Sequence, residues 1–190
     1  QKLVGKSIKR FCEDEPCDFV TLLGDNFYPD GVSSVTDPQW NTKWWDIYKP
    51  LGLVFFAALG NHDYHDNPQA QVEYSKFNKF WYMPSRYYSF ERGPAEFFVL
   101  DTEKFSKTQA KWLDAGLSQS TARVKIVYGH HPIYSYGMHG DREQLIRDLL
   151  PLLRNRATIY LAGHDHDKQM IESAGDTPMA IVGTAAETRP

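Results

Sequence analysis

The sequence is poor in features that mark several large classes of protein. Only two of its 190 residues are cysteine, which excludes a dense disulfide scaffold and a cysteine-rich zinc site. The longest apolar run, residues 51–59, is about half the length of a membrane-spanning helix, so no transmembrane segment is expected. Lysine and arginine number 21 against 24 acidic residues, without blocks of like charge, and a nucleic-acid-binding surface is therefore not expected.

The short motifs of three common enzyme classes are also absent. The chain contains no Gly-x-Ser-x-Gly, Gly-x-x-x-x-Gly-Lys or Gly-x-Gly-x-x-Gly, so a serine hydrolase, a phosphate-loop protein and a dinucleotide-binding protein have no support. Residues 1–4 show neither a signal peptide nor an initiator methionine, which leaves open whether the chain is a processed product or an internal segment.

Four short apolar runs, each ending in glycine and a polar cluster, dominate what is present. Runs of this length and composition predict buried strands, and the glycine allows a sharp turn after each strand. The polar clusters are Gly24-Asp25-Asn26, Gly60-Asn61-His62-Asp63, Gly129-His130-His131 and Gly163-His164-Asp165-His166.

Helical patterns separate these runs, at residues 39–48, 69–81, 107–118 and 141–154, with Pro151 expected to kink or end the last. Residues 87–91 and 96–100 predict a hairpin around Gly93-Pro94, and two further strands are expected near Met170 and at 180–182. Alternating strands and helices predict a single α/β domain, in which ligands bind beyond the carboxyl ends of the strands.

The polar clusters hold five of the seven histidines, with aspartate, asparagine and tyrosine nearby. Nitrogen and oxygen ligands without thiolates favour iron, zinc or manganese. His164 and His166, one residue apart after a strand, can reach two neighbouring metals, and each carboxylate oxygen of Asp25 can bind one of them. Two metals roughly 3.5 to 4 Å apart would hold a hydroxide and clamp a phosphoryl oxygen.

Cys12 and Cys17 lie five residues apart and can close a small disulfide loop in an oxidising compartment. The sequence equally allows two reduced thiols. His65 and His131 are interpreted as structural.

Together these clusters resemble the motif series of the calcineurin-like metallophosphoesterases. Tyr28, in Gly24-Asp25-Asn26-Phe27-Tyr28, narrows the resemblance to the purple acid phosphatases, and specifically to the small, tartrate-resistant type. Gln69-x-x-x-x-Tyr74-Ser75-Lys76, Trp81-x-x-Pro84 and Leu100-Asp101-Thr102 support that type. The resemblance spans nearly the whole chain and implies a four-layer α/β/β/α metallophosphoesterase sandwich.

By this resemblance, the chain is a dinuclear metal-dependent acid phosphatase that hydrolyses phosphomonoesters by metal-hydroxide attack. Asp25 is the implied bridging carboxylate, and Tyr28 and His166 are implied ligands of Fe(III). The implied ligands of the second metal, Fe(II), Zn(II) or Mn(II), are one amide and two imidazoles, those of Asn61, His130 and His164. A tyrosine phenolate stabilises Fe(III), whereas amide oxygen and neutral imidazole suit a divalent ion.

Catalytic roles also follow from the resemblance. His62 and His139 match outer-sphere histidines that bind the substrate phosphate or protonate the leaving alkoxide. Asp63 is expected to orient His62. An acidic pH optimum would follow if one of these histidines must be protonated.

The chain departs from the family at both ends. The family has an earlier Gly-Asp-x-Gly motif whose aspartate binds the ferric iron, and Asp25 lies too near the start for that motif to be present. The family also continues with strands beyond the position of Pro190. We therefore expect residues 1–190 to be one metallophosphoesterase domain, incomplete at both ends, that lacks an N-terminal βα unit and C-terminal strands.

Two other functions remain open. A calcineurin-like phosphodiesterase or nucleotidase would use two divalent metals, and a non-catalytic scaffold of phosphatase fold would explain the missing iron ligand. The expected partner is a phosphomonoester substrate, with no nucleic acid and no membrane span. The family likeness and the possible disulfide favour an exported protein that is secreted, periplasmic or lysosomal/vacuolar.

Overall fold

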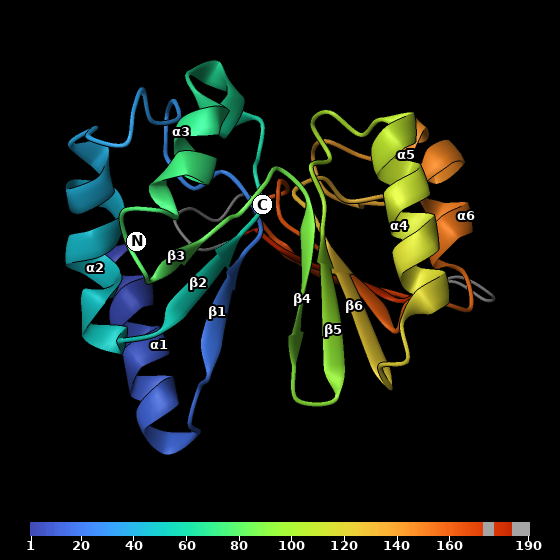
Figure 1. The fold of residues 1–190 in the computed structure, drawn as a ribbon, viewed down its shortest axis with the longest axis horizontal. Helices are drawn as coiled ribbons and strands as arrows, with labels where there is room; N and C mark the ends of the chain where they lie inside the picture. Colours follow the sequence, from blue (N-terminus) through green and yellow to red (C-terminus); the bar gives the residue numbers. More distant parts are fainter. Residues whose placement is uncertain (173–176, 184–190) are drawn as a thin grey trace.

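A computed structural model describes residues 1–172 and 177–183 of the chain. Two β-sheets pack face to face, and helices cover both outer faces (Figure 1). On one side lie α1 (Lys2–Asp14), α2 (Asp46–Tyr48) and α3 (Pro68–Tyr74), and on the other α4 (Lys107–Gln119), α5 (Glu143–Asp148) and α6 (Leu150–Leu153). The predicted four-layer α/β/β/α architecture is confirmed.

All strands predicted from the sequence are present. The first sheet is parallel and runs in the order β1 (Phe19–Leu22), β2 (Val54–Ala57), β3 (Trp81–Tyr82). The second sheet has the order β4 (Tyr88–Arg92), β5 (Ala95–Val99), β6 (Val124–Tyr128), β7 (Ile159–Ala162), β9 (Met179–Val182), β8 (Lys168–Ile171). Its four middle strands are parallel, and β4 and β8 are antiparallel edge strands.

Aromatic side chains fill the space between the two sheets. The Phe90 ring lies 3.8 Å from the Phe56 ring and 4.7 Å from the Phe97 ring, stacked on both. The buried Tyr128 hydroxyl donates a hydrogen bond of 3.0 Å to the Phe56 carbonyl, so a polar contact also joins the sheets. These contacts fix the sheets relative to each other, and with them the loops that follow their strands.

Two of the predicted helices differ from expectation. Residues 39–48 form a π-helix, η1 (Trp40–Trp45), that runs into α2 and the 3-10 turn η2 (Lys49–Leu51). The prediction of a helix over 69–81 is wrong after Tyr74, because the Asn78 side chain accepts the Phe80 amide at 3.0 Å and closes a turn. The chain then pairs with β2 as β3, beginning with the bond of 2.8 Å from the Phe55 amide to the Phe80 carbonyl.

The helical region 141–154 breaks between α5 and α6, next to Pro151, as predicted. Helix α1 was not predicted from the sequence, and its Gly5 packs against α2. A Cβ at Gly5 would lie 2.9 Å from Ile47 Cγ2, so glycine permits this close packing.

Cys12, in the last turn of α1, forms a disulfide with Cys17, which follows the helix. Within the described ranges, every helix is too short or too polar to cross a bilayer. The end of the chain at Pro190, on which the expectation of missing C-terminal strands depends, lies outside the described residues.

Candidate metal centre

The four predicted polar clusters meet beyond the carboxyl ends of β1, β2, β6 and β7. They bring together six oxygen- or nitrogen-bearing side chains, those of Asp25, Tyr28, Asn61, His130, His164 and His166. At two positions the backbone lies so close to a side chain of the site that only glycine fits. A Cβ at Gly24, where φ is +92°, would lie 2.6 Å from His130 Nδ1, and a Cβ at Gly60 would lie 2.2 Å from Asp25 Oδ1.

Asp25 is the centre of one half of the site. Its Oδ2 accepts a hydrogen bond of 2.7 Å from the Tyr28 hydroxyl, and its Oδ1 accepts one of 2.9 Å from the His62 amide. The Tyr28 hydroxyl is also 3.0 Å from His166 Nε2. Carboxylate, phenol and imidazole thus face one another, as the predicted iron ligands would.

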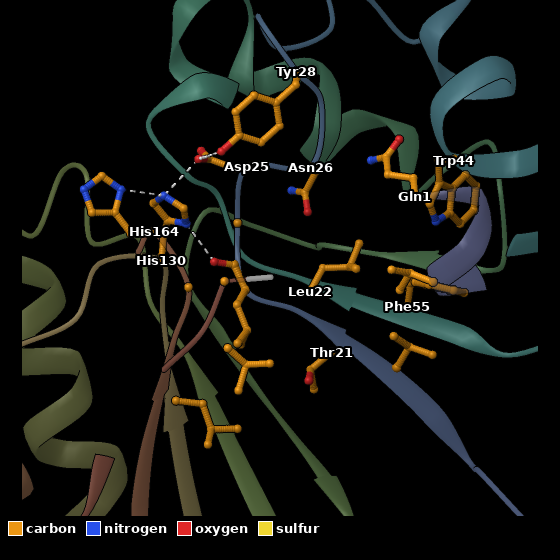
Figure 2. A pocket seen from close by; sticks show the side chains of 18 of the residues that line it. Gln1, Thr21, Leu22, Asp25, Asn26, Tyr28, Trp44, Phe55, His130 and His164 are labelled. Carbon is orange, nitrogen blue, oxygen red and sulfur yellow. Dashed lines mark hydrogen bonds and ion pairs between the residues drawn. The ribbon is translucent and has the colours of Figure 1, made fainter. Parts of the chain in front are cut away.

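The second half of the site surrounds Nε2 of the buried His130. The Nδ1 atom of this ring is 2.9 Å from the Leu23 carbonyl, which can only accept, so Nδ1 carries a proton. Nε2 lies 3.1 Å from Asn61 Oδ1, 3.2 Å from Asp25 Oδ2 and 3.1 Å from His164 Nδ1. Figure 2 shows Asp25, His130 and His164 pointing toward one another.

Three potential lone-pair donors therefore converge on one unprotonated imidazole nitrogen when His130 is neutral. Lone pairs of four such atoms repel one another unless positive charge lies between them. A single proton on His130 Nε2 can bond to only one or two of the other atoms, whereas a metal ion can accept a lone pair from each of them. The donor set thus fits a nitrogen- and oxygen-ligated metal.

The electrostatics of the site also suit metal binding. Burial opposes ionisation of Asp25, but the hydrogen bonds and charge of neighbours, chiefly His130, hold the pKa of its carboxyl well below its usual range. Burial, together with His130 and His139, lowers the pKa of His164 to about 3. An ionised carboxylate and a neutral imidazole are the forms that bind metals.

Asp63 has a different role from the one predicted. Its fully buried carboxylate accepts hydrogen bonds from the backbone amides of Asn26, Phe27 and Gly60 and from the Gln71 side chain. Burial raises the pKa of Asp63 to about 6, although these donors oppose the rise. Asp63 therefore ties the loop after β1 to the loop after β2.

The partner of the His62 ring is instead the Pro29 carbonyl, 2.5 Å from Nδ1. The expectation that Asp63 orients His62 is corrected accordingly. The His62 ring also packs on the Tyr28 ring, with 4.2 Å between centroids. His65, interpreted as structural, lies 3.2 Å from Asp30 Oδ1 and packs against His62.

His139 reaches the site from the loop before α5. Its ring lies 4.2 Å from the His164 ring, and its amide donates to Asp165 Oδ1 at 3.1 Å. The two histidines predicted to act on the substrate are thus on different loops, one beside Tyr28 and the other beside His164.

His131 lies closer to the centre than its structural interpretation implied. The ligand atoms of His130, His131 and His164 lie within 4.8 Å of one another. The buried His131 has Nδ1 3.0 Å from the Thr102 hydroxyl oxygen, and that oxygen accepts the backbone amides of His130 and His131. Its position next to His130 was the available sequence signal, whereas Thr102 was noted only as part of the Leu100-Asp101-Thr102 motif and not as a partner of these histidines.

A cavity of about 560 Å³ opens beside these residues. One end is polar and contains Asp25, Tyr28, His130, His164 and His166. The remainder is largely apolar and runs along β1 past Leu22 toward Phe55 and Trp44 (Figure 2).

Comparison with known proteins gives consistent matches. The family model described as calcineurin-like phosphoesterase matches residues 3–168. Purple acid phosphatase 7 of Arabidopsis thaliana is 33% identical over 96% of this chain and 64% of its own length. Human tartrate-resistant acid phosphatase type 5 is 30% identical over 94% of this chain and 64% of its own length. The chain therefore spans less than two thirds of these relatives.

Solved structures agree on the fold. "GAP50 the anchor in the inner membrane complex of Plasmodium" has a TM-score of 0.86 and 28% identity, covering 97% of this chain and 67% of that chain. Purple acid phosphatase PPD1 from yellow lupin has a TM-score of 0.70 and covers 100% of this chain and 41% of its own, and its 19% identity shows the fold alone.

Proposed function

The chain belongs to the calcineurin-like phosphoesterase family, and from that premise we propose that it supplies the catalytic centre of a dinuclear metal-dependent acid phosphatase. The proposed substrates are phosphomonoesters. The observation that carries this proposal is the convergence of Asp25 Oδ2, Asn61 Oδ1 and His164 Nδ1 on His130 Nε2. Relatives named purple and tartrate-resistant acid phosphatases support the specific activity.

We assign the metal ligands as the sequence predicted them. Tyr28 and His166 would hold a ferric iron, and Asn61, His130 and His164 a divalent iron, zinc or manganese, with Asp25 between the two. When bound, the metal pair would supply positive charge for the phosphoryl oxygens and an activated water as nucleophile.

The chain's own histidines would handle the substrate's protons and charge. With Nδ1 on the Pro29 carbonyl, His62 directs its other ring nitrogen away from that contact, where a protonated ring can donate to a phosphate oxygen. His139 is held against His164 on the opposite loop. Protonation of the leaving alkoxide by either ring would give an acidic optimum.

Metal content and activity on 4-nitrophenyl phosphate test this function together. We expect about two metals per molecule, at least one of them iron, and hydrolysis that is fastest at acidic pH. Asn61→Ala should lose the second metal and the activity, and Tyr28→Phe should lose the visible absorption of an iron tyrosinate. Asn41→Ala and Tyr82→Phe, at positions outside the site, are the matched controls. Less than about 0.2 metals after reconstitution with iron and zinc would refute the proposal.

A phosphodiesterase would be distinguished by substrate and by metal. It should hydrolyse bis(4-nitrophenyl) phosphate faster than 4-nitrophenyl phosphate, and Tyr28→Phe should leave its metal content unchanged. We expect the reverse preference.

A second candidate function is that of an anchor, which the high structural similarity to the Plasmodium protein favours. An anchor would keep its partner when the site is emptied. Binding of a partner by Asn61→Ala and His164→Ala variants, with no activity in the wild type, would support this second function.

We propose that the protein works in an oxidising, extracytoplasmic compartment, which the Cys12–Cys17 disulfide supports. We also propose that residues 1–190 belong to one domain, since the sheets share one packed interface.

A further inference from the structure

We propose that Arg142 forms an anion-binding subsite beside the candidate metal centre, which binds a second anionic group on the substrate's leaving group. The preferred substrates would then be phosphomonoesters that carry a further phosphate or carboxylate. The inference rests on the proposed phosphatase function, because it concerns the leaving group of that reaction.

The subsite is a second cavity, of about 350 Å³, between the β6 loop and the start of α5. His139 and Arg142 lie on its wall, and so does His164, which also lines the larger cavity with Asp25 and His130. A volume in this range suits a small molecule. A leaving group that extends past His164 would therefore enter this space.

Arg142 is placed to bind an anion there. Its side chain is 34% exposed, and the nearest carboxylate oxygen among the described residues, Glu103 Oε2, lies 3.7 Å from Nη2, which is beyond hydrogen-bond length. The guanidinium therefore keeps N–H donors for a ligand, in the planar arrangement that matches carboxylate and phosphate oxygens. The Arg142 amide donates to the Ile133 carbonyl at 3.0 Å, which fixes the backbone.

Two carboxylates, those of Asp141 and Glu143, also line this cavity, and a third, that of Glu103, lies beside Arg142. The Asp141 carboxylate is held by its own loop, because its Oδ1 accepts the Ser135 amide at 2.9 Å. Glu143 is exposed in the first turn of α5. Glu103, shared with His131 Nε2 at 3.5 Å, is thus the direct competitor for Arg142.

The wall of the subsite is tied to the metal centre. The buried Asp165, between His164 and His166, accepts the Ser135 hydroxyl and the His139 amide. The same tripeptide that provides two proposed metal ligands therefore holds the loop that leads to Arg142. These two hydrogen bonds therefore connect the loop of the subsite directly to the loop of the proposed ligands.

Two matched substrate pairs test the inference on the metal-loaded protein. Glycerol 3-phosphate and 3-phosphoglycerate differ by a carboxylate, and fructose 6-phosphate and fructose 1,6-bisphosphate by a phosphate. We expect kcat/KM to be higher for the more anionic member of at least one pair by about 10-fold, the effect of one charge-assisted hydrogen bond. The pair that shows the preference identifies the group that is bound.

Two variants should shift this preference in opposite directions. Arg142→Gln should abolish it, whereas Glu103→Gln, which removes the competing carboxylate, should increase it. Arg147→Gln, on the exposed face of α5, should leave it unchanged. Equal kcat/KM within both pairs in the wild type, or a preference that survives Arg142→Gln, would overturn the inference.

Failure of the proposed function would give a different result, since no phosphoester would then be hydrolysed. In that case, calorimetry of 3-phosphoglycerate and glycerol 3-phosphate binding tests the subsite alone. Tighter binding of 3-phosphoglycerate that is lost in Arg142→Gln would support it, and equal binding of the two compounds would overturn it.

Discussion

Substitution of Asp63 by asparagine should destabilise the fold independently of any metal. Oδ1 of Asp63 accepts from Asn26, Phe27 and Gln71. Oδ2 accepts the Gly60 amide at 2.8 Å and, at 3.2 to 3.3 Å, the backbone and side-chain amides of Asn26. An asparagine that keeps the oxygen at the Oδ1 position places an NH₂ group against the Gly60 amide. Two buried donors, the Gly60 amide and the new NH₂ group, then lack an acceptor.

Each buried donor without a partner costs roughly 1 to 3 kcal/mol, so two such donors give an expected loss of about 4 kcal/mol. This is a large fraction of the 5 to 15 kcal/mol that is typical of folded domains. The assay is urea unfolding followed by circular dichroism at pH 7.5 with EDTA present, which removes any contribution from metal binding. The side chain keeps its volume, so packing contributes little.

The matched control is Asp30→Asn, which removes the charge of a mostly exposed carboxylate paired with His65. Exposed pairs contribute about 0 to 1 kcal/mol, and this variant should unfold near the wild-type midpoint. If Asp63→Asn lost less than about 1 kcal/mol, the buried hydrogen bonds could not be holding the two loops together, and that reasoning would fail.

Three further changes give sharp expectations. Gly60→Ala should lower metal content, because its Cβ would lie 2.2 Å from Asp25 Oδ1 and displace the carboxylate; unchanged metal content by mass spectrometry would contradict this. Reduction of the Cys12–Cys17 disulfide should lower the free energy of unfolding by only about 2 kcal/mol, because it closes a short loop, and a denaturation curve measured with and without reductant checks the loss. Burial raises the pKa of Asp101 above its unfolded value of 3.8, so its stabilising contribution is complete below pH 3.8 and is lost as pH rises through the folded pKa. Unfolding at a series of pH values should show Asp101→Asn gaining stability relative to wild type as pH rises, and a parallel pH dependence would contradict the assignment.

The strand ends were predictable because one local signal specifies them. An apolar run predicts a buried strand, and the glycine after it permits a sharp turn that directs Asp25 or His130 toward the site. Parallel strands then bring their carboxyl ends to one edge without further information. The convergence of six side chains in the structure follows from that topology and from the close approaches at Gly24 and Gly60.

The supporting contacts were not predictable, because they depend on distances between loops. The resemblance implied that Asp63 orients His62, but the Asp63 carboxylate lies among the amides of the loop after β1. Thr102 belongs to a motif of the resemblance, but that motif did not indicate that its hydroxyl oxygen accepts two amides of the His130 loop. Such partners are determined by how the loops after neighbouring strands of one sheet lie against each other, β1 beside β2 and β5 beside β6.

The geometry around His130 also bears on whether the site is vestigial. The ionised side chain of Asp25 is only 7% exposed and lies against His130, whose ring also faces an amide oxygen and a second imidazole. Burial of a charge is costly unless a partner compensates it. A protein that served only as an anchor would gain stability by replacing such a group with an apolar one, since a buried polar network seldom exceeds apolar packing in stability. All six predicted ligand residues are nevertheless present and face one another. The simplest physical reason to keep them is a bound cation pair, and the metal measurement on Asn61→Ala is therefore the test that separates the enzyme from the anchor.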